Sequence, residues 1–310
     1  MKIKGLVEKS TGSFYKVRLF ENQKVIQATL RGKLRLENSE ATNPVAVGDE
    51  VFLVLEDQNY IIDEIIPREN YIIRQSSHNE HKVQILCSNI TQAVFIATLE
   101  YPFTPLNTID RFLVSAEAYH IPTFLVFNKT DLLKKQKHLM QLQDYIRIYS
   151  QAGYEVIAGN IYQPEFIEKI KQKLIHQRTF VGGVSGVGKS SIINKIEPKL
   201  KLKTGEISKQ TLKGKHTTTH VEMYPLSFGG SIIDAPGVRE FHLVDFEPYE
   251  ICQYFPEMLE YAKFCKFANC THLHEPECKV LEALERNLIS STRYNTYSSM
   301  YQEVKNKKKY

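Results

Sequence analysis

The segment 183–190 carries residues whose types and spacing suit phosphate binding. It lies between a short apolar run, 180–181, and a segment with helical character, 191–196. Glycines let backbone N–H groups turn toward phosphate oxygens, and a helix N-terminus adds partial positive charge. The pattern predicts that Lys189 reaches the β- and γ-phosphates of a nucleotide while the Ser190 hydroxyl binds magnesium. The remaining predicted contacts are Gly182, Gly183, Val184, Ser185, Gly186, Val187 and Gly188.

A second motif predicts which base the nucleotide carries. Asn128, Lys129, Thr130 and Asp131 directly follow an apolar run, 123–127, so they are expected at the carboxyl end of a strand, where α/β proteins bind ligands. The Asp131 carboxylate can accept hydrogen bonds from guanine N1–H and from its exocyclic amine. Adenine offers neither donor there, so the motif favours GTP over ATP.

Further residues suit the γ-phosphate and its magnesium ion. Asp234 follows the apolar run 231–233, an arrangement in which a carboxylate holds magnesium through water. The N–H of Gly237 is then expected to meet the γ-phosphate. Within 214–219, the Thr218 hydroxyl can complete the magnesium shell when GTP orders the loop.

The group that activates water is less clearly marked. Val238 stands where many GTPases carry a water-orienting glutamine, and a valine side chain cannot orient water. His216 can position or deprotonate water near neutral pH, and we take it as the candidate catalytic residue. A merely polar role for His216 in its loop is equally compatible with the sequence.

Cysteines and a histidine gather near the C-terminus. Three of the five cysteines occur within 265–278, which indicates metal ligation and not a disulfide framework. Three sulfurs and one nitrogen suit a closed, tetrahedral structural zinc site. His274 is a spare candidate, and Cys87 and Cys252 are expected in the core. The predicted zinc ligands are Cys265, Cys270, His272 and Cys278.

Composition limits the class of protein. The chain has 310 residues, 42% of them hydrophobic, enough for roughly two or three cores. No run of about eighteen apolar residues occurs, and residues 1–10 lack a signal peptide's apolar centre, so we expect a cytoplasmic protein without a membrane segment. The net charge is +5, and basic residues are concentrated at 31–35, 195–215 and 305–309. That distribution suits RNA, or only a solubilising surface.

Two patterns of elements must position these motifs. Five short β-rich runs split by turn residues predict a small barrel, often an OB-fold that binds nucleic acid, or else a module that only packs on its neighbour. Apolar runs then alternate with helical stretches, which predicts a largely parallel sheet with covering helices. The barrel strands are expected at 6–8, 14–20, 25–30, 50–55 and 61–66. The later strands are expected at 93–99, 123–127, 156–158 and 180–181, and the helices at 109–119, 139–152 and 166–176.

The order of the motifs is unusual, because the guanine motif precedes the phosphate loop. A parallel sheet tolerates such a circular permutation when the original ends lie close together. With this order, the chain closely resembles the ribosome small subunit-dependent GTPase A family. In place of the Ser-Ala pair that commonly backs the guanine, this chain has Ile157, Ala158 and Gly159, where a backbone N–H can supply the contact. The resemblance is carried by Gly12, 14–17, 31–33, 47–49, 109–113, 128–132, 185–191, 214–219, 234–237 and the zinc ligands.

The resemblance implies a multidomain fold and an activity. It implies an OB-fold barrel that contacts ribosomal RNA at 1–68, a circularly permuted α/β P-loop GTPase domain at 69–244, and a mostly helical zinc-binding domain at 245–310. The implied activity is slow hydrolysis of GTP to GDP, with Mg²⁺ and one structural Zn²⁺, stimulated by the small ribosomal subunit during its late maturation. His216 matches the family's proposed catalytic histidine. We expect a monomer.

Two other functions remain open on the sequence alone. A P-loop kinase would pass phosphate to a small molecule, and the guanine motif argues against it. An RNA-binding protein would use GTP only as a conformational ligand. Turnover with and without ribosomal subunits would separate that protein from a GTPase.

Overall fold

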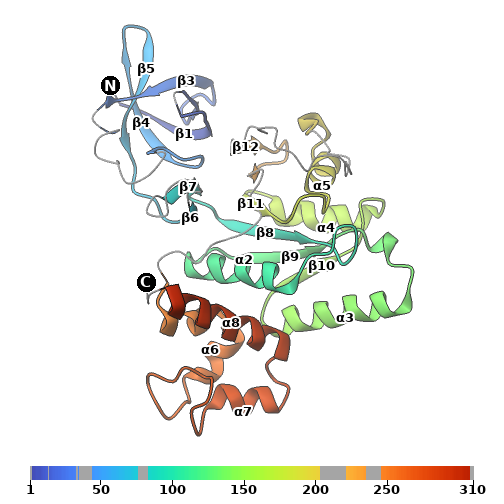
Figure 1. Ribbon diagram of the computed structural model, residues 1–310. Helices are drawn as coiled ribbons and strands as arrows, with labels where there is room; N and C mark the ends of the chain where they lie inside the picture. Colours follow the sequence, from blue (N-terminus) through green and yellow to red (C-terminus); the bar gives the residue numbers. More distant parts are fainter. Residues whose placement is uncertain are drawn as a thin grey trace, which may run out of the picture.

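The protein has three parts that follow one another along the chain: a β-barrel, a sheet with helices on both faces, and a helical unit at the C-terminal end (Figure 1). The computed structural model describes residues 2–12, 14–32, 34, 44–75, 83–202, 221–234 and 246–307.

Five strands form the N-terminal barrel. They are β1 (Ile3–Ser10), β2 (Tyr15–Leu19), β3 (Val25–Leu30), β4 (Glu50–Glu56) and β5 (Asn59–Ile65). The strand order is β1-β2-β3-β5-β4, and β1 also pairs with β4, so the barrel closes. Every second side chain of β2 points inward, because alternate residues of a strand face opposite sides. The five-stranded barrel predicted from the sequence is confirmed.

A parallel sheet forms the centre of the molecule. Its strands are β8 (Gln92–Ala97), β9 (Thr123–Phe127), β10 (Glu155–Ala158), β11 (Arg178–Gly182) and β13 (Ser231–Asp234). The order β10-β9-β8-β11-β13 is parallel throughout, as predicted, so the carboxyl ends of all five strands share one edge. An antiparallel strand that the sequence did not indicate, β12 (Glu222–Pro225), pairs with β13.

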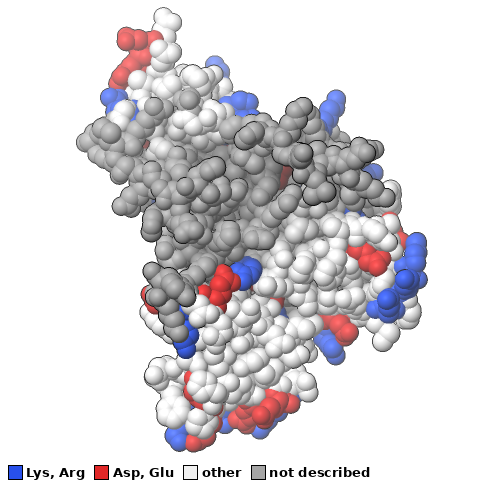
Figure 2. Space-filling view, in the orientation of Figure 1, with Lys and Arg blue, Asp and Glu red and all other residues white. Residues whose placement is uncertain are grey.

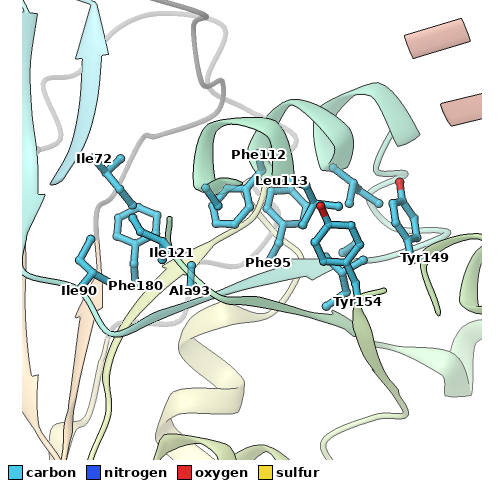
Figure 3. Packing of buried hydrophobic residues seen from close by; sticks show 14 of the residues in the cluster. Ile72, Ile90, Ala93, Phe95, Phe112, Leu113, Ile121, Tyr149, Tyr154 and Phe180 are labelled. Atoms are coloured by element: carbon cyan, nitrogen blue, oxygen red, sulfur yellow. The ribbon is translucent and has the colours of Figure 1, made fainter. Parts of the chain in front are cut away.

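Helices cover both faces of this sheet. They are α2 (Leu106–Ala118), α3 (Gln136–Gln151), α4 (Pro164–Leu174) and α5 (Lys189–Ile196). On one face, Phe112 of α2 packs against Phe95 and Phe180, with ring centroids 4.9 and 6.2 Å apart (Figure 3). The neighbouring side chains of β8, Val94 and Ile96, face α4 and α5. Both faces of the sheet are therefore buried, which explains its continuous apolar runs.

A hairpin and a buried ion pair join the barrel to the central sheet. The hairpin comprises β6 (Tyr71–Gln75) and β7 (Val83–Ser88). The buried carboxylate of Asp49 accepts two hydrogen bonds of 2.7 Å from the Arg68 guanidinium. Gly48 has φ +94°, and a Cβ there would lie 2.1 Å from the Ser88 carbonyl oxygen. Only glycine therefore allows this close contact with β7.

The barrel is also continuous with the central sheet through its first strand. Lys9 of β1 pairs with Glu222 of β12, and their side chains form an ion pair of 2.6 Å. Through this pairing the described strands of the barrel and of the central sheet form one continuous sheet of 11 strands, with β10 and β4 at its two ends.

The C-terminal unit is helical, as predicted. It contains η3 (Pro248–Tyr254), α6 (Pro256–Ala262), α7 (Lys279–Glu285) and α8 (Ser291–Lys307). Arg293 of α8 is 1% exposed and binds Asp110 of α2 at 2.8 Å and Glu257 of α6 at 2.7 Å. This buried triad ties the unit to the central sheet. No helix in the described ranges is long and apolar enough to cross a membrane.

Candidate nucleotide and zinc sites

The phosphate loop connects β11 to α5, which begins at Lys189. Gly188 precedes the helix with φ +97°, a conformation that L side chains rarely adopt. A Cβ at Gly188 would lie 2.5 Å from Asn128 Nδ2. The glycine therefore lets the loop approach the guanine motif closely. The loop includes the predicted contacts from Gly183 to Gly188, Lys189 and Ser190 begin α5, and Gly182 ends the strand before the loop.

Lys189 extends along the loop that precedes it. Its Nζ donates to the carbonyl oxygens of Gly183 at 2.6 Å and Val184 at 3.0 Å. Burial lowers the pKa of Lys189, and the nearby carboxylate of Asp234 opposes this shift. Phosphate oxygens are stronger acceptors for an ammonium group than these carbonyls. The lysine is thus positioned to bind them.

Asp234 ends β13 and pairs in register with Val181 of β11, so it lies beside the start of the phosphate loop. Burial raises its pKa, and Lys189 opposes that shift. Its buried Oδ1 has no hydrogen-bond partner among the described residues. A buried carboxylate oxygen that interacts with Lys189 at the helix start, where Ser190 is half-buried, fits a hard cation such as magnesium.

The guanine motif follows β9 and is held against the phosphate loop. Asn128 Nδ2 donates to the Val187 carbonyl at 2.9 Å, while the buried Asn128 Oδ1 has no partner within the described part of the chain. Lys129 has φ +62° and donates from Nζ to the carbonyls of Gly186 and Tyr101, both at 2.6 Å. Burial lowers the pKa of Lys129, and Asp131 opposes the shift. Two side chains of the motif therefore bind the loop directly.

The rest of the motif lies beside the end of β10. Thr130 and Asp131 belong to a short 3-10 helix, η1 (Thr130–Leu132). The Thr130 N–H donates to the Gly159 carbonyl at 3.2 Å, and Gly159 N–H donates to Phe127 at 3.0 Å. Ala158 is exposed at the end of β10, and Asp131 is half-buried. The segment that departs from the usual Ser-Ala pair thus borders the guanine motif.

Three predicted residues, His216, Thr218 and Gly237, lie outside the described residues.

The predicted zinc ligands come together between α6 and α7. The ligand atoms of Cys265, Cys270, His272 and Cys278 all lie within 4.8 Å of one another. His272 Nδ1 is 3.6 Å from Cys265 Sγ and 3.4 Å from Cys278 Sγ. Three sulfurs and one nitrogen at this separation fit a tetrahedral structural zinc with no open position. The spare candidate, His274, is exposed and outside this group.

Sequence reasoning missed the residue that organises the zinc loop. The Glu275 carboxylate accepts from the backbone N–H of Thr271 at 2.7 Å, Leu273 at 3.0 Å and His274 at 3.2 Å. Burial alone would raise the pKa of Glu275, but hydrogen bonds from Thr271 and its neighbours lower it to about 2. An acidic residue inside a short ligand-bearing loop is the signal that could have indicated this role. Tyr294 adds support, because its hydroxyl donates to the His272 carbonyl at 2.8 Å.

Two family models match the barrel and the nucleotide domain of this chain. The chain matches the RsgA N-terminal domain over residues 4–61 and the RsgA GTPase over residues 65–244. It is 44% identical over 302 residues to the small ribosomal subunit biogenesis GTPase RsgA 2 of Bacteroides thetaiotaomicron, covering 97% of each chain. It is also 44% identical to the enzyme of that name, RsgA, from Christiangramia forsetii, covering 95% of this chain and 94% of the relative.

Solved structures are similar over nearly the whole length. The crystal structure of YjeQ from Thermotoga maritima has a TM-score of 0.80 at 31% identity, covering 98% of this chain and 99% of that one. YloQ, a circularly permuted GTPase, has a TM-score of 0.77 at 29% identity, covering 99% and 96%. The fold of this chain is therefore shared with these structures over nearly its whole length. The chain belongs to the RsgA GTPase family and is a GTP hydrolase with a circularly permuted nucleotide domain.

Proposed function

We propose that this chain is a GTPase that binds the small ribosomal subunit and assists its late maturation, hydrolysing GTP to GDP and phosphate with stimulation by the subunit. The names of its relatives support the choice of partner. The subunit's ribosomal RNA is the proposed contact. A monomer in the cytoplasm, where its partner is assembled, completes the proposal.

The three parts of the chain divide this work. Residues 1–68 are the proposed RNA-binding barrel, residues 69–244 the nucleotide-hydrolysing domain, and residues 245–310 the zinc-binding domain. The pairing of β1 with β12 supports a functional link between the barrel and the nucleotide domain. Because the two strands are hydrogen-bonded, RNA bound to the barrel could shift a strand of the nucleotide sheet.

One observation carries the assignment of the nucleotide site. Asn128 and Lys129 hydrogen-bond to carbonyls of the phosphate loop at 2.9 and 2.6 Å, although more than fifty positions separate them in the sequence. A base bound beside Asp131 would then lie next to the loop whose Lys189 would bind the phosphates. The proposed contacts are Asn128, Lys129, Thr130, Asp131, Gly182, Gly183, Val184, Ser185, Gly186, Val187, Gly188, Lys189, Ser190, Thr218, Asp234 and Gly237.

Magnesium and zinc have separate proposed ligand sets. The Ser190 hydroxyl, Asp234 and Thr218 would hold magnesium, which supplies charge neutralisation at the phosphates. Gly237 would meet the γ-phosphate through its N–H. Structural zinc would be held by Cys265, Cys270, His272 and Cys278, with no role in hydrolysis.

His216 is the proposed catalytic residue. Its imidazole would orient the attacking water or accept its proton, a role that the valine at position 238 cannot fill. Stimulation by the subunit would follow from the ordering of the loop that carries His216.

The test is GTP turnover by the purified protein alone and with small subunits, large subunits or bare ribosomal RNA, with His216→Ala alongside. We expect strong stimulation by small subunits only, lost or greatly reduced in the variant. If small subunits bind but leave turnover unchanged, the chain is a nucleotide-gated RNA binder. If the variant is stimulated like the wild type, another group activates the water.

A further inference from the structure

A turn beside the guanine motif exposes two aromatic side chains. This aromatic turn, residues 98–104, connects β8 to α2, and its Tyr101 and Phe103 are 65% and 55% exposed. Its backbone is fixed, because Thr104 N–H donates to the Thr98 carbonyl at 2.9 Å and Thr98 N–H donates to Thr104 Oγ1 at 3.1 Å. Both threonines are 1% exposed. The chain therefore holds two large apolar rings in solvent on an anchored loop, which is typical of binding surfaces.

Basic side chains lie next to this turn. The lysine segment consists of Lys134 and Lys135, between η1 and α3, and Lys137 in the first turn of α3, all exposed. None of the three forms an ion pair with another described residue. Figure 2 shows basic side chains gathered at the right edge of the molecule, over the connection that leads into α3.

Two contacts fix the lysine segment against the aromatic turn. On one side of the segment, Lys129 Nζ donates to the Tyr101 carbonyl at 2.6 Å. On the other side, His138 Nδ1 lies 3.0 Å from the Glu100 carboxylate. The segment 130–137 therefore begins and ends beside the turn.

Aromatic rings next to lysines match the chemistry of unpaired RNA. Successive bases stack on exposed rings, while ammonium groups neutralise the phosphates between them. Two acidic residues also lie in this region: Glu100, whose carboxylate is 3.0 Å from His138 Nδ1, and the half-buried Asp131 of the guanine motif. We propose that the aromatic turn and the lysine segment bind an unpaired stretch of RNA in the small subunit, separately from the contact proposed for the barrel. This inference rests on the proposed function.

The position of the surface links RNA binding to the nucleotide. Lys129 contacts the Tyr101 carbonyl and the Gly186 carbonyl of the phosphate loop with the same Nζ. RNA bound to the turn would favour the conformation in which Lys129 is hydrogen-bonded to both the turn and the phosphate loop. Because coupling is reciprocal, GTP would then raise the affinity for RNA as RNA raises the affinity for GTP.

The test uses the full-length protein with two probes: isolated small subunits, and a short unstructured RNA oligonucleotide with a fluorescent label. The variants are Phe103→Ala and the double variant Lys135→Ala/Lys137→Ala. The charge-matched control is Lys169→Ala/Lys173→Ala, which removes two exposed lysines from α4. Intrinsic GTP turnover, GDP affinity and zinc content are measured for each protein.

We expect Phe103→Ala to weaken binding of both probes about 5-fold or more, since loss of one stacked base has that effect. The lysine variant should weaken binding and reduce the slope of log K against log salt by about 1.4, the value for two phosphate contacts on a single strand. The control variant and the intrinsic properties should match the wild type. A photo-crosslinker at position 103 should attach to RNA in the subunit.

Several results would overturn the inference. If Phe103→Ala and the lysine variant bind both probes as the wild type does, the proposed RNA-binding surface is wrong. It is also wrong if the control variant loses as much RNA affinity as the lysine variant. A fall in GDP affinity with unchanged RNA binding would assign the rings to the nucleotide pocket, and a crosslink to a subunit protein would assign them to a protein partner. If the wild type binds the oligonucleotide but not the small subunits, the proposed function is wrong, whereas RNA binding by the aromatic turn and the lysine segment is supported.

Discussion

The nucleotide site and the zinc cluster are built in opposite ways. The zinc ligands come from one short segment, Cys265 to Cys278, and a single carboxylate, Glu275, holds the backbone of their loop. The nucleotide site instead combines the ends of three parallel strands, with Asn128 after β9, the phosphate loop after β11, and Asp234 at the end of β13. The zinc site depends on local sequence and on its metal, whereas the nucleotide site depends on the topology of the whole sheet.

This difference explains why the nucleotide site survives permutation. Its parts need to be neighbours in the sheet, not in the chain, so the guanine motif can precede the phosphate loop. The zinc site has no such freedom, because its ligands come from one short segment whose spacing the metal requires. Substitutions in the nucleotide site should therefore leave zinc binding unchanged, and substitutions in the zinc site should leave nucleotide binding unchanged.

The largest expected effect is a change of base preference. Asp131→Asn replaces an acceptor carboxylate with an amide that can donate to the C2 carbonyl of xanthine. GTP affinity should fall by about 10³-fold, because a site built for two donors rejects a mismatched partner strongly, and XTP should bind better than GTP. Titration of fluorescent GTP and XTP analogues measures this. Asp144→Asn, an exposed change on α3, should leave the preference intact.

Loss of the phosphate-loop lysine should stop hydrolysis while sparing zinc. Lys189→Ala removes the ammonium group beside Gly183 and Val184, and we expect turnover to fall by about 100-fold or more. Zinc content per chain should stay equal to that of the wild type. Lys195→Ala, an exposed lysine of the same helix, is the control. A parallel loss of zinc in Lys189→Ala would show that the two sites are not independent.

The buried triad is where the two regions meet. Arg293→Met leaves the carboxylates of Asp110 and Glu257 buried without their cation, which should destabilise the protein by about 3 to 5 kcal/mol. Denaturant unfolding should then become biphasic, with the C-terminal unit released first. Arg286→Ala, in an exposed pair with Glu282, should leave the midpoint unchanged. A single transition at the wild-type midpoint for Arg293→Met would contradict the coupling.

The smallest expected effect separates two histidines of the zinc loop. His272→Ala removes a ligand nitrogen, so zinc affinity should drop at least as much as the 10- to 100-fold typical of losing an outer-shell partner. His274→Ala should keep full affinity because its side chain is exposed and outside the ligand group. Competition with a colorimetric chelator measures both. Guanine nucleotide affinity should be the same in the two variants, and equal zinc affinities would make His274 an alternative ligand.

The difference between features built from one local segment and features built from distant segments also explains which predictions from the sequence were accurate. The strand at Thr123–Phe127 was predicted to the residue, because an apolar run directly before a polar motif has clear limits. The four residues predicted as zinc ligands lie together in the structure, since their spacing is local. Strand ends elsewhere shifted by a few residues, as in β1, which extends to Ile3–Ser10, because partly exposed strand ends carry no periodic signal.

Elements stabilised by distant partners were missed. β12 is only four residues long and ends in Pro225, so its strand character comes from β13 and β1 on either side. The hairpin β6–β7 and the triad around Arg293 likewise depend on contacts made after folding. Periodicity within one segment cannot report a partner elsewhere in the chain.

The pairing of β1 with β12 also has a consequence for synthesis of the protein. Lys9 and Glu222 are 213 positions apart, whereas all five barrel strands lie within the first 65 residues. At roughly 5 to 20 residues per second, translation would separate the completed barrel from its sheet partner by about 8 to 30 seconds. We therefore expect the barrel to fold first on the translating ribosome and to present the end of β1 as the edge on which the last strands of the nucleotide sheet align.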